Sequence, residues 1–196
     1  MFSVGITGGI GSGKSLVCSI LGKFGVPVYS ADTEARRLMN SNSDLKDAIV
    51  QIFGERAYSS AGLNRKFLAE SVFGDQEKLT QLNGLVHPAV GQDFIRWAAL
   101  QREAPYVIEE AAILFESGAI EKMNLSVLVY APRELRILRV MERDQVEREN
   151  VLKRMGHQLS QEELLYMADH IIHNDGEQML LPQVIELHTK ILNRIE

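Results

Sequence analysis

Short apolar runs alternate along the chain with longer segments in which apolar residues recur every three or four positions. The runs predict buried β-strands over 2–7, 26–29, 106–109, 125–130 and 170–174. The periodic segments predict helices over 15–24, from about 32, and over 63–72, 77–100, 133–143 and 178–195. Strands that alternate with helices are typical of a parallel sheet with helices on both faces. The pattern therefore predicts an α/β protein, a three-layer α/β/α fold with a five-stranded parallel sheet.

Glycine and proline mark where several of these elements end. Gly25 follows the first helix, as a left-handed glycine often does. Pro132 ends the strand over 125–130 and opens the next helix. The helix over 77–100 is expected to be interrupted at Gly84, Pro88 and Gly91. Because residues 40–101 are mostly helical in pattern, we expect a helical insertion after the second strand.

Composition and charge narrow the class of protein. Of 196 residues, 45% are hydrophobic and 24% are charged, which is ordinary for a globular protein. The formal net charge of -5 argues against a nucleic-acid partner, because such proteins draw affinity from a basic surplus. Cys18 is the single cysteine, so no internal disulfide is expected. The sequence has no signal peptide and no apolar run of about 18 residues, so we expect a cytoplasmic protein without a membrane span.

One glycine-rich segment carries the clearest chemistry. Residues 8–15 fit the pattern G-x-x-x-x-G-K-[ST] at every fixed position, between a predicted strand and a predicted helix. Glycines let backbone N–H groups turn toward a polyphosphate, and the following helix adds the positive end of its dipole. We therefore expect this phosphate-binding loop to bind ATP through Gly8, Gly9, Ile10, Gly11, Ser12, Gly13, Lys14, Ser15 and Leu16.

Two side chains of the loop have separate predicted roles, and they make ATP and Mg²⁺ the expected cofactors. Lys14 supplies a mobile positive charge for the β- and γ-phosphates, and the Ser15 hydroxyl can coordinate Mg²⁺. The alternative is a turn that merely joins a strand to a helix. Such loops also serve switches, motors and pumps. The Asn-Lys-x-Asp and Asp-x-x-Gly motifs typical of GTP switches are absent from the sequence, which leaves kinases favoured.

Asp32 is the candidate for the acid–base chemistry of a kinase. It follows the second predicted strand, and ligands of an open α/β sheet bind at the carboxyl ends of strands. A kinase that phosphorylates an alcohol benefits from a carboxylate that orients the hydroxyl and takes its proton. The alternative is an ordinary capping aspartate at the start of a helix. The residues alone leave these two interpretations balanced.

A predicted helix over 133–143 is rich in arginine. Arg136, Arg139 and Arg143 share one face of it. Guanidinium groups on one face suit phosphate oxygens, whose charge they can offset. Beside a phosphate-binding loop, the group favours a functional lid, with a solvated charged face as the alternative.

Several further motifs follow the loop in a fixed order. They lie at 30–32, 35–37, 63–65, 85–88, 113–116, 154–158 and 168–174. Together with residues 5–15, these motifs resemble the dephospho-CoA kinase family, and the resemblance covers nearly the whole chain. The combination in this order is more specific than the loop alone.

The resemblance implies transfer of the ATP γ-phosphate to the ribose 3′-hydroxyl of dephospho-CoA, the last step of coenzyme A synthesis, with Mg²⁺. It implies a P-loop nucleotide-binding core over 1–31, 105–132 and 159–196. It also implies a helical acceptor-binding region over 32–104 and a small helical lid over 133–158. A monomer is favoured.

The resemblance also assigns site residues. It makes Asp32 the base beside Lys14, and Arg139 and Arg143 the lid arginines that close on ATP. Asn174 is a candidate contact to the adenine. The acceptor-binding residues that it implies are Thr7, Asp32, Arg65, His87, Leu114 and Glu116. The chain departs from the family at Ala112, where proline is usual, and at Glu110, where aspartate is frequent.

Two rival functions stay open at this point. The first is another small-molecule kinase on the same core, acting on a nucleoside monophosphate or on shikimate, which a substrate panel would separate. The second is a nucleotide-binding regulator without acceptor chemistry. It predicts ATP binding without a product, and no effect of Asp32→Asn.

Overall fold

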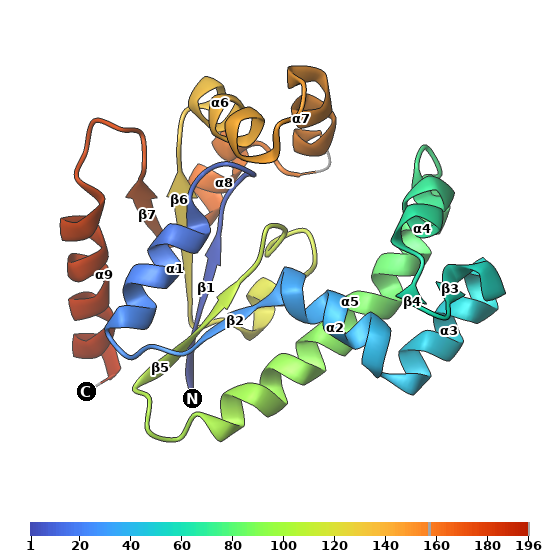
Figure 1. The fold of residues 1–196 in the computed structure, drawn as a ribbon. Coiled ribbons are helices and arrows are strands. Elements are labelled where there is room, and N and C mark those ends of the chain that lie inside the picture. The colour runs from blue at the N-terminus through green and yellow to red at the C-terminus, as the bar shows by residue number, and fades with distance from the viewer. Residues whose placement is uncertain (157, 196) are drawn as a thin grey trace. The chain divides into compact units, whose positions relative to one another are not determined.

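The computed structural model describes residues 1–156 and 158–195 (Figure 1). His157, which belongs to the motif at 154–158, lies outside the described residues. The chain forms two compact units, the first made of residues 1–30 and 98–196 and the second of residues 31–97. No helix in the described part of the chain combines the length and apolar character needed to cross a bilayer.

The first unit is built on a parallel sheet whose strand order is β2-β5-β1-β6-β7. These strands are β1 (Phe2–Thr7), β2 (Val28–Ser30), β5 (Tyr106–Glu110), β6 (Leu125–Tyr130) and β7 (His170–His173). The predicted five-stranded parallel sheet is therefore confirmed. The second strand begins two residues later than expected. Pro27 has no N–H for the ladder, although its carbonyl still accepts from the N–H of Ile108.

Helices that connect the strands along the chain cover the sheet. They are α1 (Lys14–Lys23), α6 (Arg133–Asp144), α7 (Arg148–Met155), α8 (Gln161–Met167) and α9 (Leu180–Ile195), with a short 3-10 turn η2 (Ala119–Lys122). Gly25 has a φ of 83° just after α1, as predicted, and Pro132 is the N-cap of α6. The segment predicted as a lid thus contains two helices, α6 and α7.

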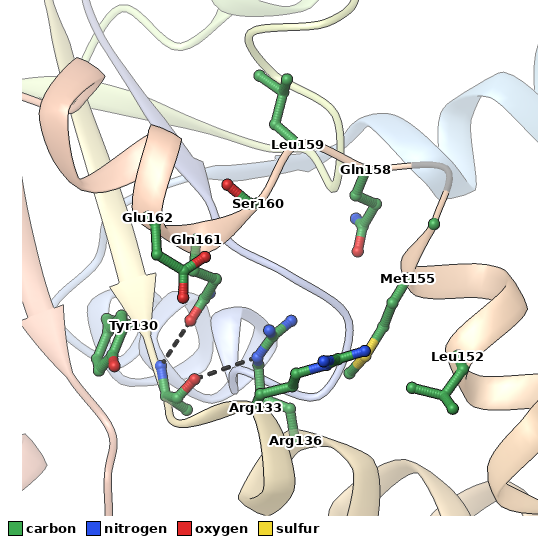
Figure 2. Close-up of a pocket in the computed structure, with 12 residues that line it drawn as sticks. Tyr130, Arg133, Arg136, Leu152, Met155, Gln158, Leu159, Ser160, Gln161 and Glu162 are labelled. Atoms are coloured by element: carbon green, nitrogen blue, oxygen red, sulfur yellow. Dashed lines mark hydrogen bonds between the residues drawn. The ribbon is translucent and has the colours of Figure 1, made fainter.

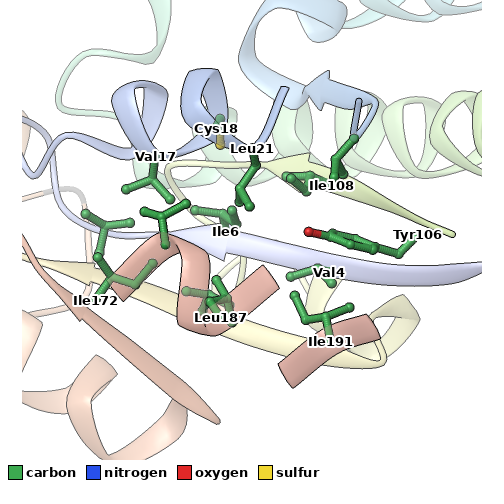
Figure 3. Close-up of a cluster of buried hydrophobic side chains, with 14 residues drawn as sticks. Val4, Ile6, Val17, Cys18, Leu21, Tyr106, Ile108, Ile172, Leu187 and Ile191 are labelled. Carbon is green, nitrogen blue, oxygen red and sulfur yellow. The ribbon is translucent and has the colours of Figure 1, made fainter. Parts of the chain in front are cut away.

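One hydrophobic cluster fixes α1 and α9 on the same face of the sheet (Figure 3). Val4 and Ile6 of β1 are fully buried in it, with Leu21 of α1 and Ile191 of α9 beside them. Burial of each such side chain contributes about 1.5–3 kcal/mol. Cys18 also lies in this cluster, so it is a buried apolar residue as expected. Since β1 is the central strand and α1 packs in the same cluster, both elements that flank the following loop belong to this core.

The second unit is helical with one small hairpin. Its elements are α2 (Ala31–Ser41), α3 (Ser43–Phe53), the 3-10 turn η1 (Glu55–Ala57), β3 (Tyr58–Ser59), β4 (Gly62–Leu63), α4 (Arg65–Val72) and most of α5 (Gln76–Leu100). The hairpin was not predicted, because strands of two residues leave no alternation in the sequence. Asn40 holds it to α2 by accepting the N–H of Leu63 at 2.9 Å.

The expected interruption of α5 at Gly84, Pro88 and Gly91 is wrong, because the helix runs unbroken from Gln76 to Leu100. Pro88 lacks the N–H of a helical hydrogen bond, which ordinarily costs about 3 kcal/mol. The helix nevertheless buries Val86, Val90 and Phe94, spaced four residues apart on one side. Pro88 itself is exposed. The buried stripe therefore outweighs the local penalty.

Candidate active site

The phosphate-binding loop joins the carboxyl end of β1 to the first turn of α1. Gly8, Gly11 and Gly13 have φ values of 150°, 82° and 95°, which favour glycine. At Gly13 a Cβ would also overlap the side-chain amide of Asn174. The loop therefore adopts a backbone that requires its glycines, as the motif predicts.

Polar side chains lie in and beside this loop. Lys14 Nζ donates to the carbonyl of Gly8 over 2.7 Å, so its ammonium group lies across the loop. The hydroxyl groups of Thr7 and Ser12 are buried and have no hydrogen-bond partner in the part of the chain that the structure describes. Leu16, in contrast, exposes 53% of its surface. An ammonium group and hydroxyls without a hydrogen-bond partner, beside a glycine-rich turn, suit a polyphosphate.

A carboxylate lies beside the serine that ends the motif. The Ser15 hydroxyl donates to Glu110 Oε1 over 2.6 Å. Glu110 is the last residue of β5, which pairs with β1, so both groups lie at the carboxyl edge of the sheet. Hydroxyl and carboxylate oxygens are ligands that Mg²⁺ accepts. From the sequence, Glu110 stood out only as a departure from a family motif, and its contact with Ser15 was not predicted.

Two predicted residues, Asn174 and Arg139, meet at the outer side of the loop. Asn174 follows β7, and its Nδ2 donates to the carbonyl of Ser12 over 2.8 Å. Arg139 of α6 donates through Nη1 to the carbonyl of Asn174 over 3.0 Å. Segments far apart in the sequence thus converge on the phosphate-binding loop.

Arg143 lies in a different environment from Arg139. Its side chain is 60% exposed and binds Asp144 over 2.7 Å, and Asp144 also binds Arg154. The hydrogen bonds from Arg143 and Arg154 lower the pKa of Asp144 well below its usual range. The structure brings Arg143 into this surface ion-pair cluster, and its role on ATP stays a prediction.

Arg136, the third arginine of the predicted face, is almost fully buried. Its Nε donates to the carbonyl of Ala131 over 3.1 Å, and burial lowers the pKa of its guanidinium. A Cβ at Gly9 would overlap this guanidinium, so the loop packs directly against it. Arg136 also lines a cavity of about 330 Å³, whose walls include Gln158 and Gln161 (Figure 2). The arginines therefore do not act as one exposed face.

The segment before α8 was not recognised as part of the site from single residues. Gln158 accepts the N–H of Ile10, a residue of the phosphate-binding loop, at 2.9 Å. Glu116 accepts the N–H of Leu159 at 2.9 Å, which gives this predicted acceptor residue a structural contact. Leu114 is fully buried, and a Cβ at Gly5 would overlap it. In this conformation packing accounts for Leu114, which has no surface to offer a substrate.

Three predicted site residues belong to the second unit. Asp32 is the second residue of α2 and follows the last residue of β2 by two positions. Arg65 begins α4, directly after Asn64, whose side chain caps that helix. His87 is half-buried in α5, and burial lowers the pKa of its imidazole. The second unit thus holds three of the six predicted acceptor residues, on three separate helices, and Thr7, Leu114 and Glu116 belong to the first unit.

Comparisons with known proteins point to one family. The family model described as dephospho-CoA kinase matches residues 2–179. A dephospho-CoA kinase of Salinibacter ruber is 48% identical over 181 residues, which cover 90% of each chain. A solved structure from Thermus thermophilus has a TM-score of 0.82 at 35% identity and covers 100% of this chain and 98% of its own. The dephospho-CoA kinase of Campylobacter jejuni has a TM-score of 0.71 at 25% identity and covers 99% of this chain and 98% of its own.

Proposed function

The chain belongs to the dephospho-CoA kinase family, and from this premise we propose how its own residues share the transfer of a phosphoryl group from ATP to dephospho-CoA. The acceptor atom that we propose is the ribose 3′-hydroxyl. The observation that carries the proposal is the phosphate-binding loop with Lys14 across it and the Ser15–Glu110 pair at its end.

The nucleotide is held by the first unit. Backbone N–H groups of the loop and the ammonium group of Lys14 bind the β- and γ-phosphates. Asn174 and Arg139 lie at the outer side of the loop. Asn174 is proposed to contact the adenine, and Arg139 is proposed to close on ATP as a lid arginine. Arg143, now paired with Asp144 on the surface, would need a movement of α6 or of its own side chain to reach the phosphates.

Mg²⁺ fits the oxygen donors at the end of the loop. Ser15 and Glu110 are the residues that would hold it, one directly and the other directly or through water. Mg²⁺ held by these residues would offset the charge that develops on the transferred phosphoryl group. The residues of this chain supply the orientation, since the 2.6 Å bond already fixes the serine against the carboxylate.

Asp32 is the residue that we propose to orient the acceptor hydroxyl and to take its proton. The support is its position two residues after β2 and its match to the family motif at 30–32. Arg65, His87, Thr7 and Glu116 are proposed to contact dephospho-CoA on the same family grounds. Leu114 and Thr7 are both fully buried. Leu114 is proposed to act only by packing, whereas Thr7 keeps a hydroxyl without a hydrogen-bond partner among the described residues, and this hydroxyl is the group proposed to face the acceptor.

The test is a measurement of ADP release by the purified protein with ATP, Mg²⁺ and dephospho-CoA, followed by mass detection of the phosphorylated product. We expect stoichiometric ADP and coenzyme A. ADP release with a nucleoside monophosphate or shikimate, but none with dephospho-CoA, would show that the proposed acceptor is wrong. ATP binding without a product on any alcohol would favour a regulator. The cytoplasmic location and the monomeric state stay predictions.

A further inference from the structure

The segment between α7 and α8 ties together two parts of the first unit that carry the phosphate chemistry. Gln158 Oε1 accepts the N–H of Ile10 at 2.9 Å. Its Nε2 donates to the carbonyl of Ala112 over 2.8 Å. One side-chain amide thus bridges the phosphate-binding loop and the segment that follows β5.

This bridge is the second connection between the same two segments. Ala112 follows Glu110 by two residues, and Ile10 lies in the loop that leads to Ser15. The Ser15 hydroxyl binds Glu110 over 2.6 Å at the other end of the loop. The loop is thus tied at Ile10 and at Ser15 to residues 110–112, and these two contacts hold the loop at a set distance from the Glu110 carboxylate.

The bridge needs a primary amide of this length. One end must accept from a backbone N–H and the other must donate to a backbone carbonyl, which a carboxylate cannot do. The side chain of Ile10 also packs against Val140 of α6 and Val151 of α7. Gln158 follows α7 closely, so the same segment fixes the loop through both a polar and an apolar contact.

We propose that Gln158 is a positioning residue for phosphoryl transfer, which acts by fixing the phosphate-binding loop against Glu110. The inference rests on the proposed function for the identity of the reaction. Loss of the outer contacts that orient a metal-binding group commonly lowers metal affinity or activity about 10–100-fold. The contacts of Gln158 therefore explain the glutamine of the motif at 154–158, for which the family resemblance gave no physical reason.

The experiment replaces Gln158 in the full-length protein by Met, which keeps the length and removes both bonds, and by Glu, which keeps only an acceptor. We expect kcat to fall about 10–100-fold in both variants, with the KM for dephospho-CoA within about threefold of the wild-type value. The Mg²⁺ concentration for half-maximal rate should rise about tenfold. Full activity in Gln158→Glu would overturn the bridge.

A matched control removes a comparable bond from the same unit. Asn124 Oδ1 accepts the N–H of Ser3 at 2.8 Å, where β1 and β6 begin. We expect Asn124→Ala to lower the unfolding temperature while kcat and the Mg²⁺ response stay at wild-type values. If the Gln158 variants lose activity only as much as Asn124→Ala at equal stability, the role is merely structural and the proposal fails.

A binding measurement separates this inference from the proposed function. Calorimetric titration with ADP, with and without Mg²⁺, needs no acceptor. In both Gln158 variants the gain in ADP affinity caused by Mg²⁺ should shrink about tenfold, while affinity for ADP alone changes less than about threefold. If the wild-type protein fails to phosphorylate dephospho-CoA, this readout still decides the role of Gln158. An unchanged Mg²⁺-dependent gain would overturn it.

Discussion

The hydroxyl of Ser15 donates to Glu110 Oε1 over 2.6 Å, although the two residues are 95 positions apart. Ser15 is in the first turn of α1, and Glu110 ends β5, the neighbour of β1. The contact therefore exists because the sheet order sets β5 beside the strand that leads into the loop. It combines a hydroxyl and a carboxylate where a metal ion bound to phosphates would be held.

Replacement of Glu110 by Gln should separate the contribution of the carboxylate charge from that of the side-chain shape. The amide oxygen can still accept from Ser15, so the fold and the affinity for ATP without metal should be kept. Loss of the carboxylate should lower kcat about 10–100-fold and raise the Mg²⁺ requirement, since the one remaining proposed protein ligand, the Ser15 hydroxyl, is neutral. Steady-state kinetics over a Mg²⁺ series measure both.

Glu121 offers a control for this charge change, because it is exposed on η2. We expect Glu121→Gln to behave like the wild-type protein. An equal loss in the two variants would mean that net charge, and not the Ser15–Glu110 contact, explains the effect.

The loop illustrates what the sequence predicts well. Its eight residues are contiguous, and Gly8, Gly11 and Gly13 each meet a local backbone demand, so a single motif identified the loop and the helix after it. The five strands were likewise found from short apolar runs. Asn174 and Arg139 reach the loop from distant segments. The family resemblance selected Asn174, and helical spacing selected Arg139 only as one of three arginines on a shared face.

Contacts set by strand order and packing could not be predicted in this way. Periodicity identifies a strand but not its neighbour, so it gave no reason to pair Ser15 with Glu110 or Ile10 with Gln158. The separation of Arg136 from Arg143 depends on how α6 packs, which helical spacing alone does not describe. The unbroken α5 shows that burial of one face can override the local signal of Pro88.

Asp32→Asn should affect turnover and not nucleotide binding. The amide has nearly the same shape but cannot take a proton from the acceptor hydroxyl, so kcat should fall about 10²–10⁴-fold while the affinity for ATP stays unchanged. Lys14→Ala should instead impair both binding and turnover, because Lys14 lies across the phosphate-binding loop. ADP-release kinetics and calorimetry with ATP measure the two effects. Unchanged turnover in Asp32→Asn would remove the proposed base and favour a regulator.

Asn174→Ala should loosen the outer side of the loop. The substitution removes the bond to the carbonyl of Ser12 and the side chain that packs over Gly13. Because loss of a well-oriented contact weakens binding by about 1–2 kcal/mol, we expect the KM for ATP to rise about tenfold, with a smaller change in kcat. Asn174→Asp keeps the size, removes the donor and adds a negative charge near the phosphates. Its KM for ATP should rise further than that of Asn174→Ala, and equal values would exclude an electrostatic contribution.

Glu109 makes the stability of the protein depend on pH. It is 2% exposed on β5, and its Oε2 has no hydrogen-bond partner among the described residues. Burial raises the pKa of Glu109 to about 7, an effect that the charge of Lys122 only partly offsets. Below a pH of about 4.5 the group is neutral in both states and costs nothing. As the pH rises toward 7, the unfolded chain releases the proton while the folded chain keeps it, so the folded state loses stability.

Glu109→Gln should remove this loss, because the amide has no proton to release. The gain in unfolding free energy over the wild-type protein should be larger at pH 8 than at pH 5 by about 2 kcal/mol, from a pKa difference converted at 1.36 kcal/mol per unit. Urea unfolding of both proteins at the two pH values measures it. Histidines such as His188, whose pKa burial lowers, affect both proteins equally and cancel in the comparison. A gain that is the same at pH 5 and pH 8 would show that Glu109 is ionised in the folded protein, and the buried carboxylate would then need a cation that balances it.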